Sequence, residues 1–71
     1  MKVYVNYNLT SIFNYIHDSN EYISWYELVS WCLDMQYYKE LYLNHFIIKY
    51  LLDEHNSYIE SLVDVPTDLD I

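Results

Sequence analysis

Residues 24–34 read SWYELVSWCLD and carry the clearest helix pattern of the chain. Ser24 and Glu27 fit a capping box, in which the serine oxygen accepts a hydrogen bond from a first-turn amide and the glutamate reaches back to the cap amide. The apolar residues recur at the three- and four-residue spacing of one helix face: Trp25, Leu28, Val29, Cys32 and Leu33. The pattern predicts an amphipathic helix that buries this face and leaves Glu27 and Asp34 on the solvated one.

A shorter helix is predicted before this one, with Asn8 as its N-cap because an asparagine oxygen can accept from a first-turn amide. The polar residues 17–20 suit the turn that ends it. The apolar residues between cap and turn have helical spacing: Leu9, Ile12, Phe13 and Ile16. Residues 2–7 instead alternate between apolar and polar side chains and favour a short strand.

The stretch 37–54 has the composition of a helix, but its apolar residues fall on two nearly opposite arcs. One arc holds Tyr37, Leu41, Ile48 and Leu52, and the other holds Leu43, Phe46 and Tyr50. A helix with two apolar arcs needs cover on both sides. We therefore expect it to be the central helix of the domain, or to offer Leu43, Phe46 and Tyr50 to a partner or to a second copy in a homodimer.

Ser57 and Glu60 repeat the capping-box pattern and predict a last helix that ends before Pro66. Its inward residues are expected to be Ile59, Leu62 and Val63. Together these patterns predict a mainly α fold, α+β at the margin, with a short N-terminal strand followed by three to four helices. We expect the strand and the helices to form one compact helical domain over residues 1–66, followed by an acidic C-terminal tail at residues 67–71.

The charge of the chain restricts its partners. Its 71 residues include 11 Asp and Glu against three Lys and no Arg, which gives a net charge of −8. Nucleic acids and anionic membranes are bound by clusters of Lys and Arg, so direct binding to either is excluded and a charged partner should be basic. The chain shows neither a secretion signal nor an apolar run of about 18 residues. We expect it to act in the cytoplasm of a host cell.

Catalytic patterns are weak in this sequence. The chain has no glycine, which excludes the usual phosphate-cradling loops and the nucleophile elbow of hydrolases. Cys32 lies in the middle of a predicted helix on its apolar face, where a nucleophile is hard to reach. Asp53, Glu54 and His55 are adjacent, but neighbouring helix residues point in different directions, so we interpret them as a solvated helix end. We expect no enzyme, no metal site and no cofactor.

The placement of the acidic residues suggests a binding function. No cation follows Lys49 in the sequence. Glu60 and Asp64 should stand about 6 Å apart on one helix face, and Glu27 and Asp34 about 10 Å apart on another. These separations are comparable to those of phosphates along a nucleic-acid strand. The alternative is that the acids only keep a tyrosine-rich surface soluble.

Ten tyrosines are more than the core of a small domain can hide, so several should reach the surface. Tyrosine supplies a large contact area with few rotatable bonds and is common at the centres of interfaces. The chain is therefore predicted to bind a partner through acidic and aromatic side chains. The candidate residues are Glu27, Asp34, Asp53, Glu54, Glu60, Asp64, Tyr15, Tyr38 and Tyr58.

In size and composition, this short chain resembles the small anti-defence proteins of phages and mobile elements, which comprise anti-CRISPR and DNA-mimicking anti-restriction proteins. The resemblance rests on the absent arginine, the abundant Tyr, Asn and Ile, the acidic helices and the opening residues MKVYVN. It implies a stoichiometric inhibitor that binds a basic surface of a CRISPR effector or restriction complex and blocks access of DNA.

Two other functions stay open from the sequence. The first is a small adaptor that binds a host polymerase or an assembly partner through the second apolar arc of residues 37–54. The second is a small enzyme that acts on a nucleotide signal or modifies an effector.

Overall fold

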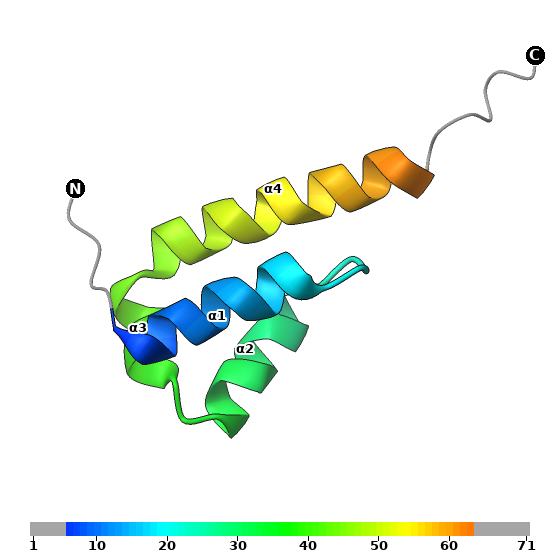
Figure 1. Ribbon diagram of the computed structural model, residues 1–71. Helices are drawn as coiled ribbons and strands as arrows, with labels where there is room; N and C mark the ends of the chain where they lie inside the picture. Colours follow the sequence, from blue (N-terminus) through cyan, green and yellow to red (C-terminus); the bar gives the residue numbers. More distant parts are fainter. Residues whose placement is uncertain (1–5, 64–71) are drawn as a thin grey trace, which may run out of the picture.

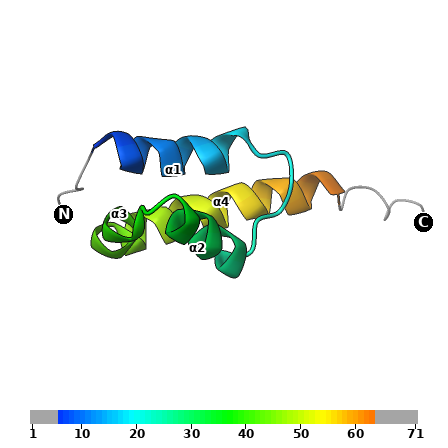
Figure 2. The ribbon, with the colours of Figure 1, turned by 90° about the horizontal axis from the view of Figure 1, so that it is seen from below.

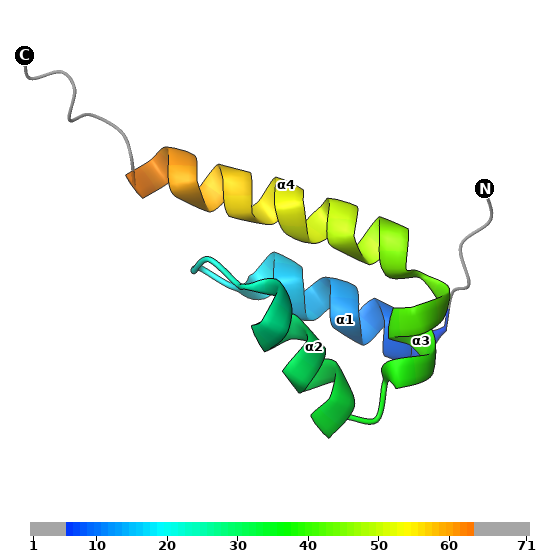
Figure 3. The same ribbon diagram turned by 180° about the vertical axis from the view of Figure 1, so that it is seen from behind.

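The computed structural model describes residues 6–63, which are mainly helical (Figure 1). The helices are α1 Tyr7–Asp18, α2 Trp25–Asp34, α3 Tyr38–Leu43 and α4 His45–Val63. Figure 2 shows α1 on one side of a layer that the other three helices form, and in the view from behind in Figure 3 α3 lies in front of the start of α1. The predicted mainly α fold is confirmed, and no strand occurs within residues 6–63. Residues 2–5 of the predicted strand and the predicted tail at residues 67–71 lie outside the described residues.

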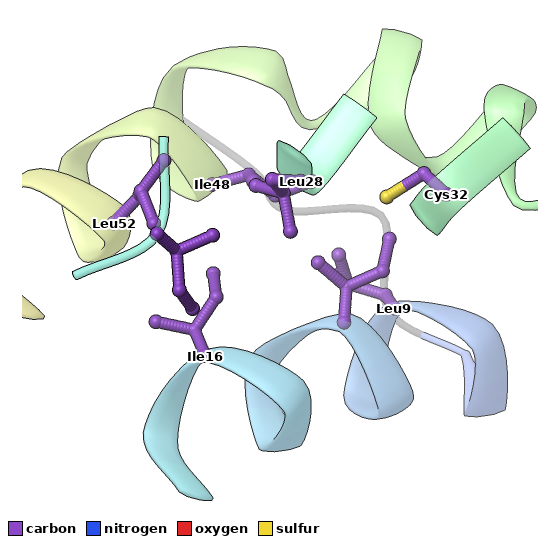
Figure 4. Packing of buried hydrophobic residues seen from close by; sticks show 8 residues of the cluster. Leu9, Ile16, Leu28, Cys32, Ile48 and Leu52 are labelled. Atoms are coloured by element: carbon purple, nitrogen blue, oxygen red, sulfur yellow. The ribbon is translucent and has the colours of Figure 1, made fainter. Parts of the chain in front are cut away.

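The core lies between α1 and the layer of the other helices (Figure 4). Eight apolar side chains are buried there: Leu9, Ile12, Ile16, Ile23, Leu28, Cys32, Ile48 and Leu52. Burial of a side chain of this size contributes about 1.5 to 3 kcal/mol. At the edge of the core, Tyr15 stacks on Trp31 with ring centroids 4.2 Å apart. The predicted inward faces of the first two helices therefore supply most of the core.

Helix α1 begins two residues earlier than predicted. Its N-cap is Asn6, whose Oδ1 accepts a hydrogen bond from the Leu9 amide at 2.8 Å. Asn8 is not the cap, because its side chain donates instead to the Glu40 carboxylate at 3.2 Å. Since Tyr7 is already helical, the prediction of a strand that extends to residue 7 is wrong.

Helix α2 confirms the helix and the Ser24 cap predicted from residues 24–34, but not the inward position of Leu33. The Ser24 Oγ accepts from the Glu27 amide at 3.0 Å, and Leu28 and Cys32 are fully buried. Leu33, predicted to lie inward, is 53% exposed. Adjacent residues lie about 100° apart on a helix. The half-buried Trp31 therefore flanks Cys32 on the covered side, and Leu33 lies on the open side.

Helix α2 ends in a left-handed turn without glycine. Gln36 has a φ of 65°, the conformation that glycine most often supplies after a helix. The Gln36 amide donates to the Leu33 carbonyl at 3.0 Å, and the Tyr37 amide donates to the Cys32 carbonyl at 2.7 Å. These two bonds make a Schellman motif, which satisfies carbonyls at the helix end and directs the chain into α3.

The prediction of one helix over residues 37–54 is wrong, because the chain bends at Asn44. The buried Asn44 side chain donates from Nδ2 to the Glu40 carbonyl at 3.3 Å, while its backbone has φ −121° and ψ 28°. A side-chain bond of this kind competes with the regular helix ladder. Both apolar arcs continue across this bend. Ile48 and Leu52 of the first arc are buried, whereas the second arc is exposed on both sides of Asn44.

The predicted boundary between residues 54 and 57 is also wrong, because α4 continues through Ser57 to Val63. Asn56 ties the middle of this helix to the α1–α2 loop through two hydrogen bonds with the Ile23 backbone. His55 Nε2 donates to the Glu21 carbonyl of the same loop at 2.9 Å. Pro66, the predicted stop, lies outside the described residues.

Candidate acidic and aromatic binding surface

Most carboxylates of the described residues lie at the surface. Residues 6–63 contain eight Asp and Glu side chains, and all are exposed except Glu40. Five of the exposed ones belong to the predicted binding site: Glu27, Asp34, Asp53, Glu54 and Glu60. Among the described residues, none of these five has a cationic side chain within ion-pair distance. Their charge is therefore directed to solvent or to a partner.

The predicted acids lie on two helices of the layer, α2 and α4 (Figure 1). Glu27 and Asp34 are seven residues apart on α2, which places them on one face about 10 Å apart. Because α4 is continuous, Asp53 and Glu60 form a second pair with the same spacing. This pair could not be predicted, because the helix was expected to end between Asp53 and Glu60. Asp64, the sixth predicted acid, lies outside the described residues.

Glu54 and Tyr58 line a groove of about 670 Å³ between the end of α1 and the second half of α4. The Ile16 and Ile59 side chains contribute to its apolar wall. His55 also lines it, so the predicted solvated helix end at residues 53–55 is instead the middle of α4. Leu62, predicted to be inward, is 56% exposed and lines the same groove.

The three tyrosines predicted for the site differ in exposure. Tyr38 and Tyr58 are each 61% exposed and are free to contact a partner. Tyr15 is half-buried against Trp31, and burial, followed by the nearby Glu27 carboxylate, raises its pKa. Among the tyrosines not selected from the sequence, three have strongly exposed rings: Tyr7, Tyr26 and Tyr42. Only Tyr26 has a sequence indication, since it lies beside Glu27 outside the apolar face of α2.

The second apolar arc predicted for residues 37–54 is exposed rather than covered by the chain. It belongs to a surface on α3 and α4 that we call the aromatic patch, with members between 49% and 81% exposed: Tyr38, Tyr42, Leu43, Phe46 and Tyr50. All but Tyr50 line a hollow of about 630 Å³, together with Trp25 and His45. Lys49 lies 5.2 Å from the Trp25 ring centroid, in a cation–π contact beside this hollow.

Glu40 is the one buried carboxylate among residues 6–63, with 4% of its surface exposed. Its Oε2 accepts hydrogen bonds from Asn6 Nδ2 at 3.0 Å and from Asn8 Nδ2 at 3.2 Å. The bond from Asn6 is the largest influence on the Glu40 pKa, which is lowered although burial alone would raise it. Glu40 therefore joins α3 to the start of α1 and supplies no charge to the binding surface.

Cys32 carries the one thiol of the chain. Burial, with a smaller contribution from Glu40, raises the pKa of the Cys32 thiol to about 11, so it is protonated at neutral pH. Within residues 6–63, no three His, Cys, Asp or Glu side chains converge to hold a metal ion. No helix in that range is both long and apolar enough to cross a membrane.

Comparison of the chain with protein-family models, curated protein sequences and solved structures found no match.

Proposed function

We propose that this protein is a stoichiometric inhibitor of a host defence complex that targets nucleic acid, and that this complex is a CRISPR effector. The inhibitor blocks access of DNA by occupying a basic surface of the complex. The observation that carries the proposal is the set of exposed carboxylates on α2 and α4 that have no cationic partner among the described residues. Such groups attract Lys and Arg, and a groove built for nucleic acid is the densest source of both.

The contact would combine charge and aromatic area. The pair Glu27 and Asp34 and the pair Asp53 and Glu60 would each meet basic side chains that otherwise contact phosphates. Exposed rings such as Tyr38 and Tyr58 would supply the desolvated part of the interface. Charge complementarity of this kind accelerates association and makes it sensitive to salt.

A DNA-displacement assay tests the proposal. Increasing amounts of the protein are added to purified CRISPR effectors and restriction complexes that hold fluorescent target DNA. We expect one of them to lose its DNA at near-equimolar inhibitor, with an affinity that falls as salt rises. If no complex in the panel releases DNA, or if release needs only catalytic amounts of the protein, the proposal is wrong.

Charge-neutral variants of equal size identify the face. The double variants Asp53→Asn with Glu60→Gln, and Glu27→Gln with Asp34→Asn, each remove two charges without a change in shape. The matched control, Asp18→Asn with Glu21→Gln, removes two exposed charges outside the predicted set. We expect at least one of the first two to weaken inhibition by about 10-fold or more, and the control by less than about 3-fold. Equal losses in all three would indicate net charge alone and would contradict a specific acidic face.

A further inference from the structure

The aromatic patch lies on α3 and the first half of α4, and its Tyr50 is three residues before Asp53 of the acidic face. In α3, Tyr38 and Tyr42 are four residues apart, and Phe46 and Tyr50 have the same spacing in α4, so each pair lies on one side of its helix. The hollow lined by Tyr38, Tyr42 and Phe46 connects the two helices. The patch is therefore one surface on which three exposed rings border a depression.

The area of the patch is large for a domain of this size. With about 200 Å² for each aromatic side chain, the exposed parts of its four rings amount to about 550 Å². Apolar patches on monomeric proteins reach about 300 to 600 Å², and each partner of a standard interface buries about 800 Å². The four rings would supply about two thirds of such an interface, and the residues around them the rest.

The charge around the patch favours a second copy of this chain. No exposed carboxylate occurs between residues 36 and 52, because Glu40 is the one acid there and it is buried. Lys39 and Lys49 both belong to this stretch. Two chains of net charge −8 repel each other over most of their surface, and the patch is where they can approach with the least repulsion.

We propose that two copies associate through the aromatic patch as a symmetric dimer. Two-fold symmetry brings the same surface of both copies together, so that an exposed ring of the patch on each can pack into the hollow of the other. A surface on which exposed rings border a depression suits such self-complementary packing. This inference does not need the acidic face, although Tyr38 belongs both to the patch and to the rings proposed for the inhibitor interface.

Sedimentation equilibrium of the wild-type chain gives the first test. Between about 1 µM and about 1 mM, the range of weak to moderate dimers, the mass should rise from 8.8 kDa toward twice that value. A mass that stays at 8.8 kDa over the whole range overturns the proposal. The patch would then be open to a different protein, as an adaptor requires.

Two substitutions in α4 locate the interface. Phe46→Asp places a charge in the patch, in the first turn of α4 where an acidic residue suits the helix dipole and should not prevent folding. Tyr58→Asp changes another exposed ring of the same helix outside the patch, 61% exposed against 74% for Phe46. We expect Phe46→Asp to raise the dimer dissociation constant by about 30-fold or more and Tyr58→Asp by less than about 3-fold. The reverse order would overturn the proposal.

A dilution series of the wild-type chain, followed by NMR, decides the question without any variant. Amide signals that shift with concentration should cluster at residues 38–50. Shifts that cluster instead at the groove between α1 and α4, around Leu51 and Ile59, would place the contact elsewhere and overturn the proposal.

Discussion

The side-chain amide of Asn56 makes two hydrogen bonds with the backbone of Ile23. Asn56 Nδ2 donates to the Ile23 carbonyl at 2.8 Å, and the Ile23 amide donates to Asn56 Oδ1 at 2.9 Å. The loop between α1 and α2 is thereby held to the middle of α4, and the Ile23 side chain is placed in the core with 2% of its surface exposed. A loop without secondary structure needs such partners, because its backbone groups are otherwise unsatisfied when buried.

Asn56→Ala should lower the free energy of unfolding by about 2 kcal/mol, because it leaves both Ile23 backbone groups without their partner. Urea unfolding followed by circular dichroism measures this change. The control is Ser57→Ala, the next residue of α4, which is exposed and should change stability by less than about 0.5 kcal/mol. Equal effects of the two variants would show that the Asn56 bonds contribute nothing beyond helix formation.

Glu40→Gln should destabilise the protein in a pH-dependent manner. The folded state lowers the pKa of Glu40 below its ordinary value of 4.5, so its ionised form stabilises the fold above that pH and the contribution is lost as pH falls through the folded pKa. We expect a loss of about 1 to 2 kcal/mol at neutral pH, the size of a hydrogen bond to a charged group.

The pH dependence separates this effect from a packing defect. The difference between wild type and Glu40→Gln in urea unfolding should shrink as the pH is lowered to about 3. Glu60→Gln, an exposed control on α4, should differ little from wild type at either pH. A Glu40→Gln deficit that is the same at both pH values would show that the charge of Glu40 has no part in stability.

Gln36→Gly should stabilise the protein by about 0.5 to 1 kcal/mol. A non-glycine residue in the left-handed region costs about 1 to 2 kcal/mol, and the greater freedom of glycine in the unfolded chain offsets part of that gain. Thermal unfolding of Gln36→Gly and Gln36→Ala gives the comparison, since alanine shortens the side chain but keeps its Cβ. No gain with glycine, or an equal gain with alanine, would argue against backbone strain at Gln36.

The Cys32 thiol should react slowly with a disulfide reagent in the folded protein. A pKa of about 11 instead of 9.0 lowers the thiolate fraction near neutral pH about 100-fold, and full burial blocks access as well. The expected labelling rate is therefore at least about 100-fold below that of the same chain in denaturant. Comparable rates in the two states would show that the thiol is accessible in the native protein.

The helices could be predicted from the sequence where one local pattern decided the structure. The Ser24 cap and the buried Leu28 and Cys32 of α2 followed from spacing alone. The bend at Asn44 did not, because it depends on a side chain that is buried only after α3 and α4 have packed. Ser57 gave a misleading indication, since the same capping pattern can occur inside a helix that tertiary bonds hold together.

The binding surface was predictable in kind but not in layout. Charge and tyrosine content indicated exposed acids, and Asp53 and Glu60 were both selected, yet their pairing on one helix required the continuous α4. Glu40 could not be told apart from the exposed acids. Its burial depends on Asn6 and Asn8, which are more than 30 residues away in the sequence.

Mutual exclusion of the protein and DNA on one target tests the proposed function most directly. Native mass spectrometry of a target complex mixed with DNA and with this chain shows which assemblies form. We expect the target with DNA and the target with the 8.8 kDa chain as two separate species, because both occupy the same basic surface. A ternary species that holds the target, DNA and the chain together would contradict DNA mimicry.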